Sequence, residues 1–153
     1  FAHATGNKRL PEAWWNQFVT ALRERRPHLR LVNVLAHHGC SQLPGTVPPV
    51  YSSDLRKLAS ALAGMQGFIS ADCGVMHLAA AVGTPTLGLF TCSSRARYAP
   101  YGARNRGVDL ADDGSVADAV CMAVGWLDQV TGPDAGADFP HQGDIHCSAV
   151  AWS

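Results

Sequence analysis

Two short apolar runs flank a segment of helical character in residues 67–90, and this arrangement constrains the fold more than any other part of the sequence. Residues 67–71 and 86–90 have the length and apolar content of buried strands. Residues 74–82 between them are rich in small apolar side chains, and Gly83 and Pro85 are suited to ending a helix there. A strand, a helix and a second strand in succession form a βαβ unit, so this segment predicts a parallel sheet.

The N-terminal part of the chain continues the alternation of helices and strands. A helix is expected to begin at Pro11 and to end before Pro27. The β-rich residues 29–36 predict a strand, and residues 37–49 predict a loop with room for one brief strand. The apolar residues that recur at helical spacing in the first helix are Trp14, Trp15, Phe18, Val19 and Leu22.

Two further helices are predicted, one on each side of the βαβ segment. Ser52 or Ser53 is expected to cap the first of them, with Asp54 in its first turn. A long polar loop is expected after residue 90, and residues 116–130 predict the last helix. The inward-facing residues are expected to be Leu55, Leu58, Ala59 and Leu62 in the former, and Val116, Val120, Ala123, Val124 and Leu127 in the latter.

We therefore predict an α/β domain over residues 1–130, with a Rossmann-like parallel sheet and helices on both faces, followed by a tail over residues 131–153. Residues 1–6 are expected to end a strand, and the first residue is not Met, so the chain is expected to begin inside a longer gene product. Sheets of this kind bind ligands at the carboxyl ends of their strands, beside the helix N-termini. The chemistry is therefore expected in the strand-to-helix loops.

Charge and composition exclude several classes of protein. Twelve Lys and Arg balance twelve Asp and Glu, whereas a protein that neutralises nucleic-acid phosphates needs a basic excess. Hydrophobic residues make up 47% of the chain, which argues against disorder. The apolar runs are nevertheless shorter than the roughly 20 residues of a membrane-spanning helix.

The cysteines and histidines match no metal-binding template. The five cysteines are widely separated, and no two have the C-x-x-C spacing of a zinc site or redox pair. We therefore expect reduced thiols in a cytoplasmic compartment. His141, His146 and Cys147 lie near one another in sequence, but their spacing fits no set of ligands. We expect neither a metal ion nor another cofactor.

The turn Asp72-Cys73-Gly74 joins a strand to a helix at the expected ligand edge. The first N–H groups of a helix have no partner within it, and together with the helix dipole they form a binding site for a phosphate or diphosphate. Gly74 leaves the backbone accessible, and His77 lies about one turn further along. Structural explanations also exist: Asp72 could cap the helix, Gly74 could ease the turn, and His77 could be half-buried. Their combination at this edge favours a ligand site.

The segment from Asp72 to Phe90 resembles the signature of the ADP-heptose:lipopolysaccharide heptosyltransferase family, glycosyltransferase family 9. Members typically have Asp-Ser/Thr-Gly, two residues, His-Leu-Ala-Ala-Ala, and then Gly, Pro-Thr and an apolar strand. The likeness extends upstream to Lys8-Arg9-Leu10-Pro11-Glu12, which is similar to the family's Lys-Arg-Trp-Pro-Glu, and downstream to Tyr98-Ala-Pro-Tyr-Gly102. It covers roughly residues 1–110 in the correct order and spacing.

The resemblance implies the C-terminal half of a two-domain GT-B glycosyltransferase. This half would bind a nucleotide-sugar donor, of the ADP-heptose kind, for inverting, metal-independent transfer in lipopolysaccharide core biosynthesis. A missing N-terminal domain would bind the lipid-linked saccharide acceptor and supply the catalytic base, so this chain would hold no catalytic residue and be inactive alone. The full-length protein would be cytoplasmic, with peripheral contact to the inner face of the membrane.

The resemblance also implies which residues contact the donor. Asp72 would contact the sugar hydroxyls, and His77 would lie on the diphosphate side of the site. The full set of implied donor-binding residues is Thr5, Lys8, Asp72, Cys73, Gly74, Val75 and His77.

Departures from the family pattern leave an alternative open. Cys73 stands where the family has Ser or Thr, which exchanges a good hydroxyl donor for a weak thiol. Leu10 replaces Trp, a change that we assign to packing. Residues 37–42 contain no acidic residue for the nucleotide ribose, where Asn33 or Gln42 could substitute. The alternative is a degenerate, non-catalytic α/β binding or scaffold module.

Residues 93–106 contain four arginines and two tyrosines. One interpretation is a solvated basic loop. The other is a loop that closes over an anionic ligand or faces an anionic lipid acceptor.

Overall fold

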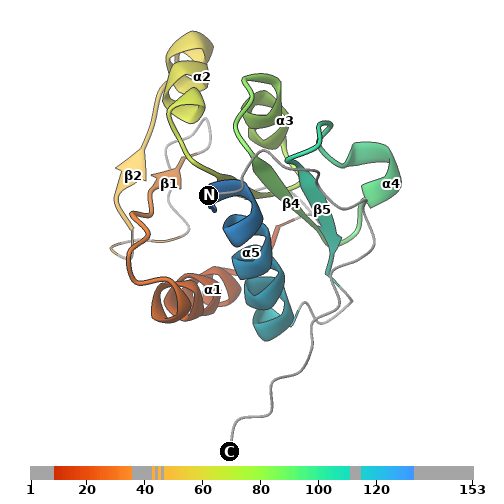
Figure 1. Cartoon of the computed structure of the whole chain (residues 1–153). Helices are drawn as coiled ribbons and strands as arrows, with labels where there is room; N and C mark the ends of the chain where they lie inside the picture. The colour runs from red at the N-terminus through yellow and green to blue at the C-terminus, as the bar shows by residue number, and fades with distance from the viewer. Residues whose placement is uncertain (1–8, 36–42, 44, 46, 111–114, 133–153) are drawn as a thin grey trace, which may run out of the picture.

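The computed structural model describes residues 9–35, 43, 45, 47–110 and 115–132 of the chain. Helices and strands alternate along most of this part, as Figure 1 shows. The helices are α1 (Glu12–Arg25), α2 (Leu55–Ala63), α3 (Gly74–Ala81), α4 (Arg95–Tyr98) and α5 (Val116–Thr131), and the strands are β1 (Asn33–Val34), β2 (Pro49–Val50), β3 (Phe68–Ala71), β4 (Thr86–Phe90) and β5 (Arg106–Asp109).

All the described strand pairs are parallel, as the sequence predicts. β1 pairs with β2, and β4 lies between β3 and β5 in a three-stranded sheet. The register of the larger sheet places Ile69 opposite Leu87 and Leu89 opposite Val108. Every residue of β3 and β4 is buried, which is typical of parallel strands covered on both faces.

Two apolar clusters cover the opposite faces of the larger sheet. Successive side chains of a strand point to opposite faces, and β3 follows this rule: Ile69 belongs to the cluster built with α1 and α5, whereas Phe68 belongs to the cluster built with α2 and α3. Figure 1 shows α1 and α5 side by side, and α2 near α3. The predicted arrangement with helices on both faces is therefore confirmed.

Aromatic side chains hold α1 in the larger cluster. Trp14 and Phe18 stack with ring centroids 5.2 Å apart, and Trp15 meets both rings edge-on. Val19 and Leu22 complete the buried face, which is the face predicted from the sequence. The helix follows Pro11 and ends at Arg25, before Pro27.

The start of α2 differs from the prediction. Asp54, rather than Ser52 or Ser53, is the N-cap, because its Oδ1 accepts hydrogen bonds from the backbone N–H groups of Arg56 and Lys57, at 2.8 and 3.3 Å. Leu55 then becomes the first helical residue and is 66% exposed, so its predicted place in the core is wrong. Leu58 and Leu62 are buried, as predicted.

The long loop predicted after residue 90 contains two elements, α4 and β5. They lie close together because Gly107 has no side chain: a Cβ there would stand 2.8 Å from Cγ of Arg95 and 3.1 Å from Cβ of Ala99. The predicted strand over residues 29–36 is shorter, since only β1 is paired, and the predicted brief strand is β2. Residues 1–6, most of residues 37–49 and the tail from residue 133 lie outside the described residues.

The described cysteines agree only in part with the expectation of reduced thiols. Cys73 and Cys92 are not disulfide-bonded, whereas Cys121 on α5 takes part in a disulfide, so the expectation is wrong for Cys121. Among the residues that the structure describes, no group of three or more His, Cys, Asp or Glu side chains could hold a metal ion. None of the helices in that part of the chain has the length and apolar character to cross a membrane. His141, His146 and Cys147 lie outside it.

Candidate functional site

The structure brings five of the seven predicted site residues together where β3 ends and α3 begins. These are Asp72, Cys73, Gly74, Val75 and His77. Thr5 and Lys8 lie outside the described residues. In a parallel α/β sheet this place is the ligand edge.

The chain passes from strand to helix within two residues. Asp72 extends the pairing of β3 by one step, since its N–H donates to the carbonyl of Leu89 at 3.2 Å. Cys73 is extended, with φ −153° and ψ 169°, and its carbonyl accepts the N–H of Met76 at 3.1 Å. Gly74 and Val75 therefore occupy the first positions of α3, where backbone N–H groups have no partner within the helix.

Cys73 is the N-cap of α3, but its thiol does not cap the helix. Its Sγ lies 3.3 Å from Oγ of Ser70, which is fully buried. The Ser70 hydroxyl donates to the carbonyl of Ala71 at 2.7 Å. The thiol is thus turned toward β3, and it does not cap the first amides of α3.

Gly74 is exposed, and a Cβ built there would meet no atom of the described residues within 4 Å. Its φ is not positive, so the backbone does not require glycine either. A side chain at position 74 would therefore extend into space that the described residues leave open.

Two other glycines fix the position of α3. A Cβ at Gly88 of β4 would stand 2.7 Å from Sδ of Met76, so the bare backbone of β4 lets the helix pack closely on the sheet. Gly83 ends the helix with φ +84°, a conformation that glycine adopts without strain. Beyond it, Thr84 donates its hydroxyl to the carbonyl of Leu62 at 2.8 Å and ties the end of α3 to α2.

Asp72 and His77 differ in exposure. Asp72 is 5% exposed and does not cap α3, because Cys73 holds that position. His77 is exposed on the helix rather than half-buried, so packing in the core does not account for it. Of the two residues suggested for a ribose contact, Asn33 is fully buried in β1, and Gln42 lies outside the described residues.

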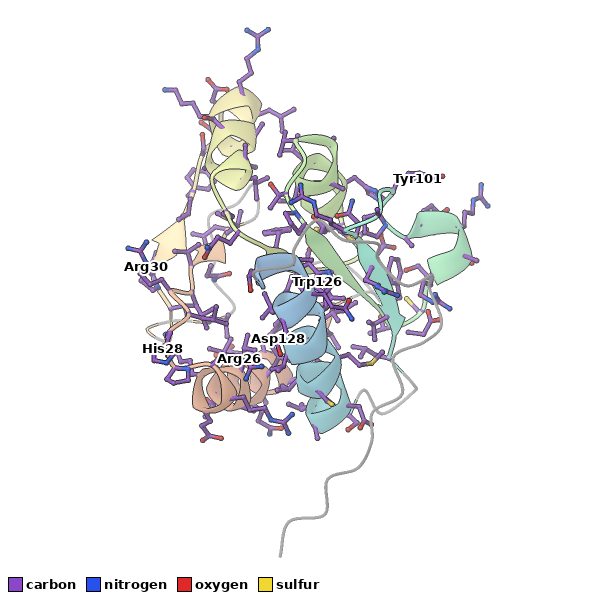
Figure 2. The ribbon with its side chains drawn as sticks, viewed as in Figure 1. Arg26, His28, Arg30, Tyr101, Trp126 and Asp128 are labelled. Carbon is purple, nitrogen blue, oxygen red and sulfur yellow. The ribbon has the colours of Figure 1, made fainter. Side chains whose placement is uncertain are left out.

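The arginine-rich segment contains α4 and the start of β5, and its arginines make contacts within the protein although Arg97 and Arg104 are exposed. Arg95 forms an ion pair with Asp109, with Nε 2.7 Å from Oδ2. Arg104 donates to the carbonyl of Gly83 at 3.0 Å, and Arg106 is only 7% exposed. Arg97 lies over the ring of Tyr98, 5.5 Å from its centroid. Tyr101 in the same segment is 87% exposed, and Figure 2 shows it near α4.

Sequence reasoning did not single out Thr91 and Ser93, which follow β4 at the same edge of the sheet. Their hydroxyl oxygens are buried and have no hydrogen-bond partner among the described residues. Their position directly after a predicted strand is the one signal that could have marked them.

Comparisons with known proteins agree with this architecture. Residues 4–120 match the family model described as glycosyltransferase family 9 (heptosyltransferase). The solved structure of the E. coli heptosyltransferase WaaC with ADP is similar in fold, with a TM-score of 0.66 and 22% sequence identity. The match covers 83% of this chain and 44% of that one, so this chain spans less than half of the relative's length. A search of curated protein sequences gives no match.

The likeness to WaaC confirms the predicted fold class. The described elements form a parallel α/β unit that corresponds to one half of a GT-B glycosyltransferase.

Proposed function

Because this chain belongs to glycosyltransferase family 9, the heptosyltransferase family, we propose that it is the donor-binding half of a glycosyltransferase. The proposed donor is a nucleoside diphosphate sugar of the ADP-heptose kind. Two findings support this assignment: the site lies at the ligand edge of the sheet, and the related WaaC structure contains ADP. The proposed acceptor is a lipid-linked saccharide of lipopolysaccharide core biosynthesis, bound by an N-terminal half that lies outside this chain.

The observation that carries the proposal is the open start of α3. The first helical amides have no side-chain cap from Cys73, and a Cβ at Gly74 would meet no atom of the described residues within 4 Å. Helix N-termini bind phosphates through such N–H groups and through the helix dipole. The arrangement therefore suits a diphosphate.

The same donors provide a means of catalysis. When the acceptor hydroxyl attacks the anomeric carbon, the bond from that carbon to the diphosphate breaks and negative charge develops on the leaving ADP. Fixed N–H donors stabilise this charge without a metal ion. Because the acceptor displaces the diphosphate in one direct step, the anomeric configuration would be inverted. The base that takes the acceptor's proton would come from the other half, so this chain alone would be inactive.

The proposed donor contacts are those expected from the sequence. Backbone N–H groups of Cys73, Gly74 and Val75 would bind the diphosphate, with Lys8, Thr5 and His77 on the same side. Asp72 would accept hydrogen bonds from the sugar. The full-length enzyme would act in the cytoplasm, in peripheral contact with the membrane that holds its acceptor.

Titration calorimetry of the chain with ADP tests the proposal. We expect a dissociation constant below about 1 mM, unchanged when magnesium is replaced by EDTA. A sugar-transfer assay with ADP-heptose should show no product from this chain alone, and product when the N-terminal half of a family member is supplied. Absence of ADP binding at millimolar concentration would contradict the proposal.

One observation favours the alternative, a non-catalytic binding or scaffold module. Cys73 turns its thiol to Ser70, so this position presents no hydroxyl to a ligand. A module of this kind would bind no ADP, and the same calorimetry therefore separates the two functions.

A further inference from the structure

Two neighbouring hydroxyl groups after β4 are buried without a partner. Neither Oγ1 of Thr91 nor Oγ of Ser93 has a hydrogen-bond partner among the described residues, and both atoms are hidden from solvent. Cys92 and Ser94, the alternate residues of the same loop, are exposed. A buried hydroxyl that makes no hydrogen bond destabilises the folded state, and native structures retain few of them.

The strand register places the backbone of Thr91 beside the start of α3. Ala71 pairs with Leu89, and Asp72 continues the pairing by donating its N–H to the carbonyl of Leu89. Two residues beyond Ala71 and Leu89, the same parallel register sets Thr91 beside Cys73, the N-cap of α3. On the other side, Leu110 donates to the carbonyl of Phe90 at 2.7 Å, which continues the pairing with β5. Thr91 and Ser93 therefore follow the central strand at the same edge as the proposed diphosphate site.

We propose that the hydroxyls of Thr91 and Ser93 bind the sugar of the donor, an inference that rests on the proposed function. Backbone N–H groups only donate hydrogen bonds, so the start of α3 suits the anionic diphosphate. A hydroxyl both donates and accepts, as the hydroxyls of a sugar do, so this pair suits the neutral part of the donor. Because the two oxygens are shielded from solvent, sugar binding requires a shift of the loop over residues 91–94.

The extent of this shift is limited by the elements on each side of the loop. β4 is fully buried in the centre of its sheet. α4 packs closely on β5, since a Cβ at Gly107 would stand 2.8 Å from Cγ of Arg95 and 3.1 Å from Cβ of Ala99. The loop therefore moves between two fixed ends and remains next to α3.

The test uses the whole chain with the paired substitutions Thr91→Val and Ser93→Ala. Val keeps the shape of Thr and Ala nearly that of Ser, so both remove the hydroxyls at little cost in packing. We expect an unchanged or higher melting temperature without ligand, because the substitutions remove buried hydroxyls that have no hydrogen-bond partner.

Calorimetry should give an ADP affinity equal to that of the unsubstituted chain, and an affinity for ADP-heptose that is about tenfold lower. Ser94→Ala, which removes an exposed hydroxyl from the same loop, is the matched control. It should change neither the melting temperature nor the affinity for ADP-heptose.

The results separate this inference from the function on which it rests. A melting temperature that falls by several degrees would show that the hydroxyls have partners in the protein, and would overturn the inference. Unchanged affinity for ADP-heptose, with ADP still bound, would overturn it while leaving the proposed function intact. Failure of the unsubstituted chain to bind either ligand would overturn both.

Discussion

Gly74 and Gly88 belong to the same strand and helix unit, but they are glycine for different reasons. At Gly88 a Cβ would collide with Met76 and with the ring of Phe90, at 2.7 and 2.9 Å, so packing requires the missing side chain. At Gly74 neither packing nor backbone conformation requires it, since the Cβ position is open and φ is not positive. We assign that open space to the ligand.

This assignment predicts that Gly74→Val separates stability from binding. The free energy of unfolding should change by less than about 1 kcal/mol, as is usual for substitutions at open positions. Affinity for ADP should fall at least about tenfold, because the side chain blocks approach to the helix amides.

Gly125→Val is the matched control, since a Cβ at Gly125 of α5 also meets no atom of the described residues within 4 Å. It should leave both stability and ADP affinity nearly unchanged. Equal ADP affinity for the two variants, by calorimetry, would contradict the role assigned to Gly74.

At the scale of elements, local patterns predicted most of the fold. α1, α3, α5, β3 and β4 have sequences whose periodicity and end signals agree with their structure. β5 was missed because its sequence, Arg-Gly-Val-Asp, has no apolar run, and it becomes a strand through its pairing with β4. α4 was missed because four residues are too few to show helical periodicity.

The candidate site was predictable to the same extent. The residues from Asp72 to His77 are contiguous, so one motif located them all. The contribution of Thr91 and Ser93 depends on the strand register and on burial, neither of which is encoded in a local pattern.

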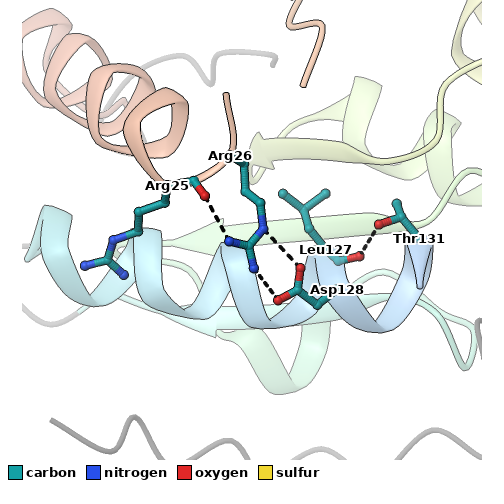
Figure 3. Close-up of polar contacts among 5 residues, drawn as sticks. All are labelled: Arg25, Arg26, Leu127, Asp128 and Thr131. Carbon is teal, nitrogen blue, oxygen red and sulfur yellow. Dashed lines mark hydrogen bonds and ion pairs between the residues drawn. The ribbon is translucent and has the colours of Figure 1, made fainter. Parts of the chain in front are cut away.

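A salt bridge between α1 and α5 also depends on tertiary structure. Figure 3 shows Arg26 directed at Asp128, with Nε 3.1 Å from Oδ1 and Nη2 2.5 Å from Oδ2. Nη1 of the same guanidinium donates to the carbonyl of Arg25 at 2.9 Å. The contact joins the C-cap of α1 to α5, two helices whose apolar faces share one cluster, and Figure 2 shows both residues where these helices meet.

We expect this ion pair to contribute little to stability, because its side chains are 37% and 55% exposed. A double-mutant cycle of Arg26→Ala and Asp128→Ala, followed by urea unfolding, should give a coupling energy of about 0.5 to 1 kcal/mol. The coupling should decrease at about 1 M NaCl. Arg23→Ala, at an exposed position in the last turn of α1, is the control and should show no coupling with Asp128. A salt-independent coupling of several kcal/mol would contradict this expectation.

At the scale of the whole molecule, the chain corresponds to less than half of the solved relative. The larger apolar cluster lies with α1 and α5 on one face of the sheet, and the smaller one with α2 and α3 on the other. The proposed donor site lies at the edge between these layers, where β3 leads into α3. Family membership, the sheet topology and the open helix start therefore lead to the same edge of the molecule.

The central claim is that the start of α3 holds the diphosphate of a nucleotide-sugar, and amide NMR during an ADP titration tests it most directly. We predict saturable shifts that are largest at Gly74, Val75 and His77, with little change at residues of α1 such as Phe18, on the far side of the sheet. Saturable binding of ADP that shifts other residues and leaves the first turn of α3 unchanged would contradict the claim.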